Sequence, residues 1–175
     1  MATDAGMLAL WDPQRFTGIV DYDTWDSELG EDEDVERHIR TGAFVPINIR
    51  SDGAFGVLVR IGGLGQHVRL TEREARHRLV TSDAYLFHSS GQVWLSGIEA
   101  VGADAWPGTA KCDLSVGRYS VVIHLIAWED DPGSVNENGT PSKTALSDFV
   151  ALVNPAVSGQ DNFRSAVETF DRPES

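Results

Sequence analysis

The sequence predicts a mainly β protein, an antiparallel β-sandwich of about seven to eight strands with one short helix. Short runs rich in Val, Ile, Phe and Tyr recur along the chain, and clusters of Gly, Pro, Asn and Asp separate them. Strands and helices do not alternate as a parallel α/β sheet requires. We expect residues 1–154 to form one domain. Residues 155–175 are expected to be a polar tail that is disordered or holds a short helix around 163–170.

The longest strand pattern covers residues 117–128, with the sequence GRYSVVIHLIAW. One face of a strand with period two would carry Tyr119, Val121, Ile123 and Leu125, all of them apolar, and the other face is mostly apolar. Strands that are apolar on both faces are typical of the middle of a sheet that is covered on both sides. The pattern therefore predicts a buried central strand.

The region before residue 40 is predicted to be loosely structured. Residues 1–14 are expected to be a loose lead-in, and the alternation in 15–22 predicts a strand. An acidic stretch follows, and its middle lacks apolar periodicity, so we expect a mobile loop with at most a helical turn over 34–39.

Two hairpins are predicted from turn signals between strand patterns. Ser51-Asp52-Gly53 separates the patterns at 43–50 and 54–61. Pro46 cannot donate a ladder hydrogen bond, so the first of these strands is expected at a sheet edge or a bulge. Ser89-Ser90-Gly91 separates the patterns of the second hairpin, at 84–88 and 92–98.

One helix has a clear start signal. Thr71 and Glu74 match the capping box, and good helix formers follow over 72–79. Residues 132–144 are rich in Pro, Gly, Ser and Asn, which predicts a long loop, and 146–153 predicts a last strand.

The composition excludes several classes of function. A net charge of −13 argues against binding nucleic acid through its phosphates, because that requires clustered Lys and Arg. No apolar run approaches the ~20 residues that span a bilayer, so no membrane association is expected. The single cysteine, Cys112, excludes an internal disulfide and a cysteine-based zinc site and favours a cytoplasmic setting. No cofactor is predicted.

The acids are concentrated between residues 21 and 36, where nine occur without a single base. This density fits a contact surface for a basic protein partner. The candidate partner-binding residues are Asp21, Asp23, Asp26, Glu28, Glu31, Asp32, Glu33 and Asp34. The alternative is that this stretch and the five arginines between Arg60 and Arg78 are two solvated faces that attract each other.

Two further kinds of site remain open. Trp25 and Trp106 lie in expected loops, where they could stack on a small molecule or a carbohydrate. His88 and His124 lie on strands that could become neighbours and, with an acid from the 21–36 stretch, could hold the metal ion of an enzyme. Spacing alone predicts no metal site, because no two histidines have the separation of a helical or hairpin pair.

The second half of the chain resembles a known family. The pattern at 84–99 is followed by a polar segment, by Leu114, Gly117 and Tyr119 at the entry to a long strand, and by a final strand. This order, over about residues 80–153, resembles the competence-J family, small bacterial β-sandwiches that bind and inhibit a DNA-entry nuclease. It is also similar to toxin-immunity proteins. The resemblance implies a non-enzymatic inhibitor or immunity protein for a basic enzyme such as a nuclease.

Overall fold

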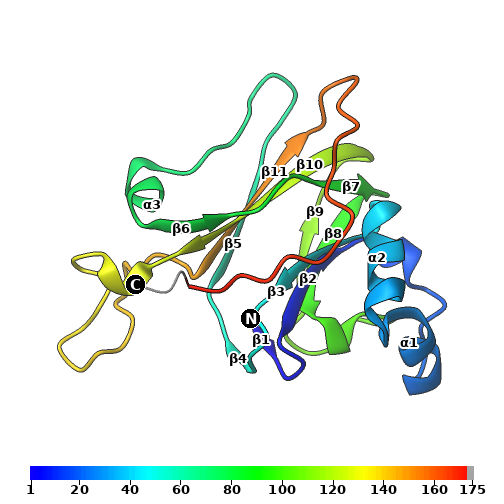
Figure 1. The fold of residues 1–175 in the computed structure, drawn as a ribbon, viewed down its shortest axis with the longest axis horizontal. Helices are drawn as coiled ribbons and strands as arrows, with labels where there is room; N and C mark the ends of the chain where they lie inside the picture. Colours follow the sequence, from blue (N-terminus) through cyan, green and yellow to red (C-terminus); the bar gives the residue numbers. More distant parts are fainter. Residues whose placement is uncertain (173–175) are drawn as a thin grey trace.

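The computed structural model describes residues 1–172 and is mainly β, as the sequence predicts (Figure 1). These residues form two larger sheets and a two-stranded one, and the strands do not close into a barrel. They contain three short α-helices where one was predicted: α1 (Tyr22–Leu29), α2 (Asp32–Arg40) and α3 (Glu72–Arg76). Short 3-10 turns lie at η1 (Pro13–Arg15), η2 (Ile98–Ala100) and η3 (Trp128–Asp130). Within the described residues, no helix has the length and apolar character needed to cross a membrane.

The five-stranded sheet is built around β10 (Gly117–Ile126), which confirms the predicted central strand. β11 (Phe149–Pro155) pairs along one edge of β10, while β7 (Tyr85–Ser89) and β6 (Arg78–Thr81) share the other. The predicted core face, Tyr119, Val121, Ile123 and Leu125, is buried. β5 (Val57–Ile61) runs parallel to β11, so the expectation of a wholly antiparallel structure is wrong at this edge.

The four-stranded sheet has the order β3 (Phe44–Asn48), β2 (Met7–Trp11), β8 (Gln92–Gly97) and β9 (Ala110–Asp113). β2 lies in its middle with all five side chains buried, so the expected loose lead-in is wrong. The run MLALW is apolar on both faces and too short to show a period. Pro46 lies on β3 at the sheet edge, as predicted. The strand expected over 15–22 does not form, since η1 and turns occupy this region before α1 begins.

Neither predicted hairpin forms, although both turns lie where the sequence places them. The strands on either side of each turn belong to different sheets, and the short β4 (Gly53–Ala54) pairs with β1 (Ala2–Thr3). At the second turn, the chain crosses from β7 to β8. Ser89 Oγ donates to the carbonyl oxygen of Leu114 at 2.8 Å, and the Ser90 amide donates to Asp12 Oδ2 at 3.0 Å. These contacts fix a corner between two sheets.

Side chains of both larger sheets meet in one apolar core. Trp11 lies at its centre, edge-to-face against Phe16 and Trp94 with ring centroids 5.7 and 5.1 Å away. Its indole nitrogen donates to Ser96 Oγ at 3.0 Å, so the buried donor is satisfied. A second cluster on the outer face of the five-stranded sheet contains Ile126, Val150, Leu152, Val68, Leu70 and Leu146.

The described part of the tail, residues 156–172, contains no helix, which corrects the expectation for 163–170. This segment runs extended along the molecule and forms isolated bridges from Arg164 to Tyr85 and from Thr169 to Asn48. Phe170 is only 3% exposed and packs edge-to-face on Phe149 at 5.7 Å. The tail therefore completes the core. The expected tail residues 173–175 lie outside the described part of the chain.

Candidate functional site

The acidic stretch is ordered as α1 and α2, which lie together on the right in Figure 1. Asp21 caps α1, because its Oδ1 accepts the Thr24 amide at 2.9 Å while the Thr24 hydroxyl accepts the Asp21 amide at 3.1 Å. Leu29, Val35 and Ile39 are buried beneath the helices. The expected mobile loop is therefore wrong. Val35 and Ile39 are four residues apart, the spacing of one helical face, so a helix signal is present among the acids although the sequence prediction limited it to a turn over 34–39.

The charges of α2 follow its dipole, with acids in its first turn and Arg37, His38 and Arg40 in its last. Arg37 pairs with Glu28 at 3.1 Å and with Asp34 at 2.5 Å. Arg40 approaches Glu36 at 3.8 Å. Part of the acidic run is therefore explained by helix formation and local pairing.

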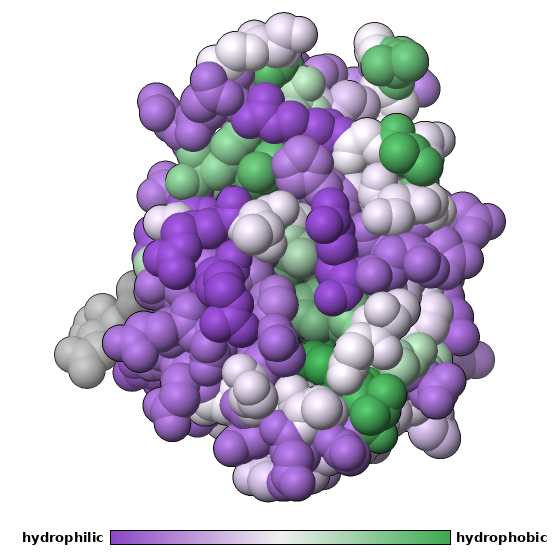
Figure 2. Space-filling view, turned by 90° about the vertical axis from the view of Figure 1, so that its right-hand side faces the viewer, coloured by the Kyte–Doolittle hydropathy of each residue, from purple (hydrophilic) through white to green (hydrophobic). Residues whose placement is uncertain are grey.

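The remaining acids form what we call the acidic surface: Asp23, Asp26, Glu31, Asp32 and Glu33. All five are exposed. Their carboxylates make no ion pair and no side-chain hydrogen bond with any of residues 1–172. Since α1 is only about 12 Å long, these charges lie within roughly one or two Debye lengths of one another. Figure 2 faces the side of the molecule that carries α1 and α2, and most of its atoms belong to hydrophilic residues.

The two candidate ligand-binding tryptophans, Trp25 and Trp106, line one cavity of about 460 Å³. We call it the tryptophan cavity. It lies between the start of α1 and the segment that follows η2. Its lining residues are Ile19, Val20, Asp21, Tyr22, Trp25, Glu99, Val101, Gly102, Ala103, Asp104 and Trp106. The structure therefore brings together two residues that lie far apart in the sequence.

The walls of the cavity are held by specific contacts. The Trp25 indole N–H donates to the Ile98 carbonyl oxygen at 2.9 Å, which fixes the orientation of the ring. Tyr22 stacks on Trp25 with ring centroids 6.2 Å apart and planes 23° apart. The Ala103 amide donates to the Ile19 carbonyl oxygen at 2.8 Å and fixes the opposite wall. Trp106 stands at the rim and is 56% exposed.

The cavity has three carboxylates, Asp21, Glu99 and Asp104, and its lining contains no lysine, arginine or histidine. Glu99 is oriented by Thr3 Oγ1, which donates to Oε2 at 3.0 Å, and by the Asp4 amide, which donates to Oε1 at 3.2 Å. Hydrogen bonds from the Thr24 hydroxyl and amide lower the pKa of Asp21. The cavity is therefore largely apolar, with three aromatic and three acidic residues in its lining, and sequence reasoning identified only its tryptophans and Asp21.

The structure does not bring His88 and His124 together. His88 lies opposite Arg118 of β10, and His124 lies six residues farther along the same strand. At about 3.3 Å per residue, Arg118 and His124 are about 20 Å apart. His124 Nδ1 lies 3.0 Å from Thr81 Oγ1, and burial lowers the pKa of both histidines. Among residues 1–172, no group of three or more His, Cys, Asp or Glu side chains is placed to hold a metal ion.

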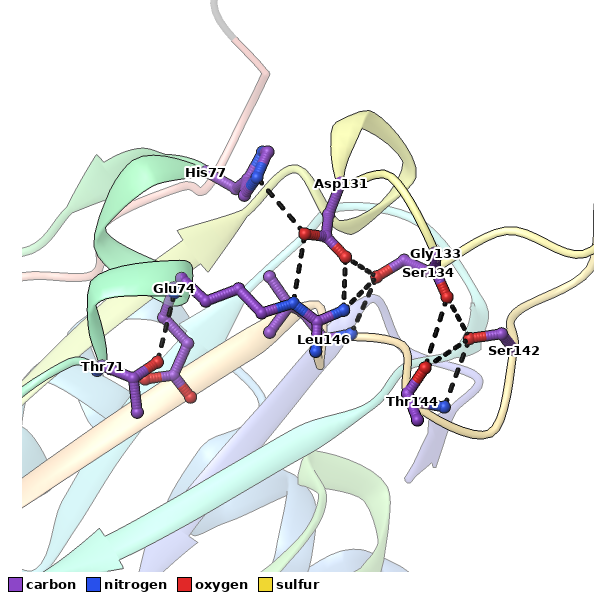
Figure 3. A network of polar contacts seen from close by, with 10 residues as sticks. Thr71, Glu74, His77, Asp131, Gly133, Ser134, Ser142, Thr144 and Leu146 are labelled. Atoms are coloured by element: carbon purple, nitrogen blue, oxygen red, sulfur yellow. Dashed lines mark hydrogen bonds and ion pairs between the residues drawn. The ribbon is translucent and has the colours of Figure 1, made fainter.

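Polar groups also converge around Asp131, on the opposite side of the molecule from α1 and α2 (Figures 1 and 3). Arg73 binds both carboxylate oxygens of Asp131, and these hydrogen bonds, with one from Ser134, hold the pKa of Asp131 well below its usual range. Ser134 Oγ donates to Asp131 Oδ2 at 2.6 Å, and His77 Nε2 lies 3.4 Å from Oδ1. The carboxylate thus stands between the histidine and the serine, so the arrangement anchors a loop rather than activating a nucleophile.

Two of the five arginines of the arginine-rich segment are paired outside the acidic stretch. Arg60 binds Glu74 at 2.8 Å, and Arg73 binds Asp131. No ion pair joins the arginines of 60–78 to the acids of 21–36 within the described residues. The two segments therefore do not neutralise each other through ion pairs, although the acids are solvent-exposed as the alternative expects. Glu74 and Thr71 form the predicted capping box of α3.

No family model matches the chain, and no curated protein matches it. Among solved structures, the chain is similar to one described as crocagin biosynthetic gene J, with a TM-score of 0.58 and 12% identity over 89% of this chain and 93% of that one. It is also similar to ComJ from Bacillus subtilis, described as an inhibitor of the DNA degrading activity of NucA, with a TM-score of 0.42 and 10% identity over 89% and 92%. The first likeness shows a shared fold. The second places ComJ, from the family that residues 80–153 resemble, among the structural neighbours.

Proposed function

We propose that this protein is a non-enzymatic, acidic protein-binding domain that binds a basic protein through the acidic surface. The observation that carries the proposal is a set of five exposed carboxylates on two ordered helices and the residue that joins them, without an ion pair to any of residues 1–172. Their mutual repulsion is relieved when a basic surface approaches, and the gain appears mainly in the association rate.

The proposed role is that of an inhibitor or immunity protein for a basic enzyme such as a nuclease, in the bacterial cytoplasm. The sequence resemblance of residues 80–153 implies this role, and carboxylates are suited to occupy sites that a nuclease uses for phosphates. We also propose that the two larger sheets are the layers of a β-sandwich, since their side chains share one core. Such a scaffold would hold α1 and α2 rigidly for docking.

The experiment compares two variants with the same change in charge. The first replaces acids of the acidic surface: Asp23→Asn, Asp26→Asn, Glu31→Gln and Glu33→Gln. The control replaces four exposed acids elsewhere, none of them in an ion pair with a described residue: Asp52→Asn, Asp130→Asn, Glu72→Gln and Glu137→Gln. Partners captured from a lysate of the source organism are identified by mass spectrometry, purified, and measured for association rate at several ionic strengths.

We expect the first variant to associate about tenfold or more slowly at low salt and to show a weaker salt dependence. The control should stay within about threefold of the wild type. Equal loss in both variants would mean that only net charge matters. An unchanged rate in the first variant would show that the helices are a solubilising surface, and either result would refute the proposal.

A second candidate function is favoured by the tryptophan cavity. The meeting of Trp25 and Trp106 in one cavity supports binding of a small molecule or a carbohydrate by ring stacking. Titration with a panel of mono- and disaccharides, followed by tryptophan fluorescence, tests it. A saturable change that persists at high salt and is lost in Trp106→Ala would support this candidate, and no saturable change would reject it.

A further inference from the structure

We propose that the tryptophan cavity binds an arginine side chain of the basic protein partner. The inference rests on the proposed function, because it assigns the cavity to the same partner that docks on the acidic surface. The two sites are contiguous, since Asp21 lines the cavity and caps the helix that carries Asp23 and Asp26. One basic segment can therefore reach both sites.

The acidic residues of the cavity lining favour a positively charged ligand. The lining offers three carboxylates and no basic side chain, and these carboxylates form no ion pair within residues 1–172. The carboxylates of Asp21 and Glu99 accept hydrogen bonds from neutral groups only, so an anion would be repelled and a neutral sugar would leave the negative charge without a cation. A cation is attracted by the carboxylates and by the negative faces of the aromatic rings together.

Shape selects arginine among the cationic side chains. The guanidinium group is planar, stacks on aromatic rings and donates in a fork to carboxylates, whereas the lysine ammonium is a compact, strongly hydrated charge. Tyr22 and Trp106, 72% and 56% exposed, provide aromatic surface at the open side. Trp25 lines the cavity, with its N–H bound to Ile98 and its ring stacked with Tyr22. The volume of about 460 Å³ lies within the range of about 300–1,000 Å³ that is common for ligand pockets.

The experiment uses the full chain and three short peptides, acetyl-Gly-Gly-Xaa-Gly-Gly-amide with Xaa as arginine, citrulline or lysine, at constant ionic strength. Citrulline has the shape of arginine without its charge. Binding is followed by the indole N–H resonances of the five tryptophans, with Trp25 and Trp106 assigned from Trp→Phe variants. Trp106→Ala and Asp104→Asn test the cavity, and Asp130→Asn, an exposed acid elsewhere, is the matched control.

We expect the arginine peptide to shift the Trp25 and Trp106 resonances saturably and to bind more tightly than the lysine peptide. Citrulline should bind at least about tenfold more weakly than arginine. Trp106→Ala should weaken arginine binding by about threefold to thirtyfold, the range of a cation–π contact. Asp104→Asn should also weaken it, and Asp130→Asn should not change it. Equal binding of citrulline, equal affinity in Trp106→Ala, or no saturable shift up to about 20 mM peptide would each overturn the inference.

The outcome is separable from that of the proposed function. The acidic-surface variant retains all the cavity residues, so it should bind the arginine peptide within about twofold of the wild type while it associates slowly with the protein partner. If the wild type does not bind the arginine peptide but still associates with the protein partner in a salt-dependent way, the arginine inference is refuted and the proposed function stands. Peptide binding without any effect of the acidic surface on association would remove the proposed function and leave an arginine-binding cavity.

Discussion

The substitution Phe170→Ala tests whether the C-terminal segment belongs to the core. The Phe170 ring is 3% exposed and contacts Phe149, and its amide donates to the Asn48 carbonyl oxygen at 2.9 Å. Burial of about 150–250 Å² at about 25 cal/mol per Å² gives an upper limit of about 4–6 kcal/mol. Measured Phe→Ala costs in cores are about 3–5 kcal/mol. An extended terminal segment can also detach, which limits the loss, so we expect about 3 kcal/mol.

Urea unfolding and thermal melts measure this change, and for a domain of this size it lowers Tm by about 6–12 °C. Phe163→Ala is the matched control in the same segment, because Phe163 is half-buried, is not part of the core cluster, and has the Arg118 guanidinium 5.2 Å from its ring. It should cost about 1 kcal/mol or less. Equal costs for the two variants, or a cost below about 0.5 kcal/mol for Phe170→Ala, would refute the assignment of this segment to the core.

Three further outcomes are expected. Ile123→Ala, at a fully buried site on β10, should reduce the free energy of unfolding by about 2–5 kcal/mol in urea titrations. Because the pKa of Asp131 is lowered in the folded state, the ionised carboxylate stabilises the fold above its ordinary pKa of 3.8, and this contribution is lost as the pH falls below that value. In thermal melts between pH 6 and 2, Asp131→Asn should therefore lose less Tm on acidification than the wild type. Gly42→Ala places a Cβ 2.6 Å from a His88 ring atom at a φ of +72°, so it should lower the free energy of unfolding by more than about 1 kcal/mol in urea titrations. Gly139→Ala, at a φ of +79° with open space around it, should lower the free energy of unfolding less than Gly42→Ala does.

Local signals predicted the elements whose own residues determine them. The buried strand β10 followed from ten residues with an apolar core face, and α3 followed from its capping box. The turns at Ser51 and at Ser89 were also placed correctly. What these turns connect could not be predicted, because a turn between two strand patterns looks the same whether the strands pair or separate into different sheets. β2 was missed because five consecutive apolar residues carry no period.

The candidate site was predictable in part for the same reason. The acids at 21–36 are recognisable in the sequence because of their density. Trp25 and Trp106 are recognisable because they are aromatic residues that lie outside the predicted strands. Val35 and Ile39 have the four-residue spacing of a helical face, but this short signal was outweighed by the density of the surrounding acids, which favoured a mobile loop. The contacts of α2 with β3 and β7 depend on the tertiary fold. Tyr22, Glu99 and Asp104 join the cavity only through the tertiary fold. No sequence signal identifies them.

The position of β2 in the middle of its sheet has a consequence for synthesis. Its partners β3 and β8 lie at 44–48 and 92–97, so at ~5–20 residues per second β2 waits several seconds for β8. During that time an apolar five-residue strand is without one of its two neighbours, and such segments associate with other nascent chains. A chaperone that shields MLALW during this interval should therefore raise the soluble yield of the wild-type chain, and aggregates should form through this segment when β8 is delayed.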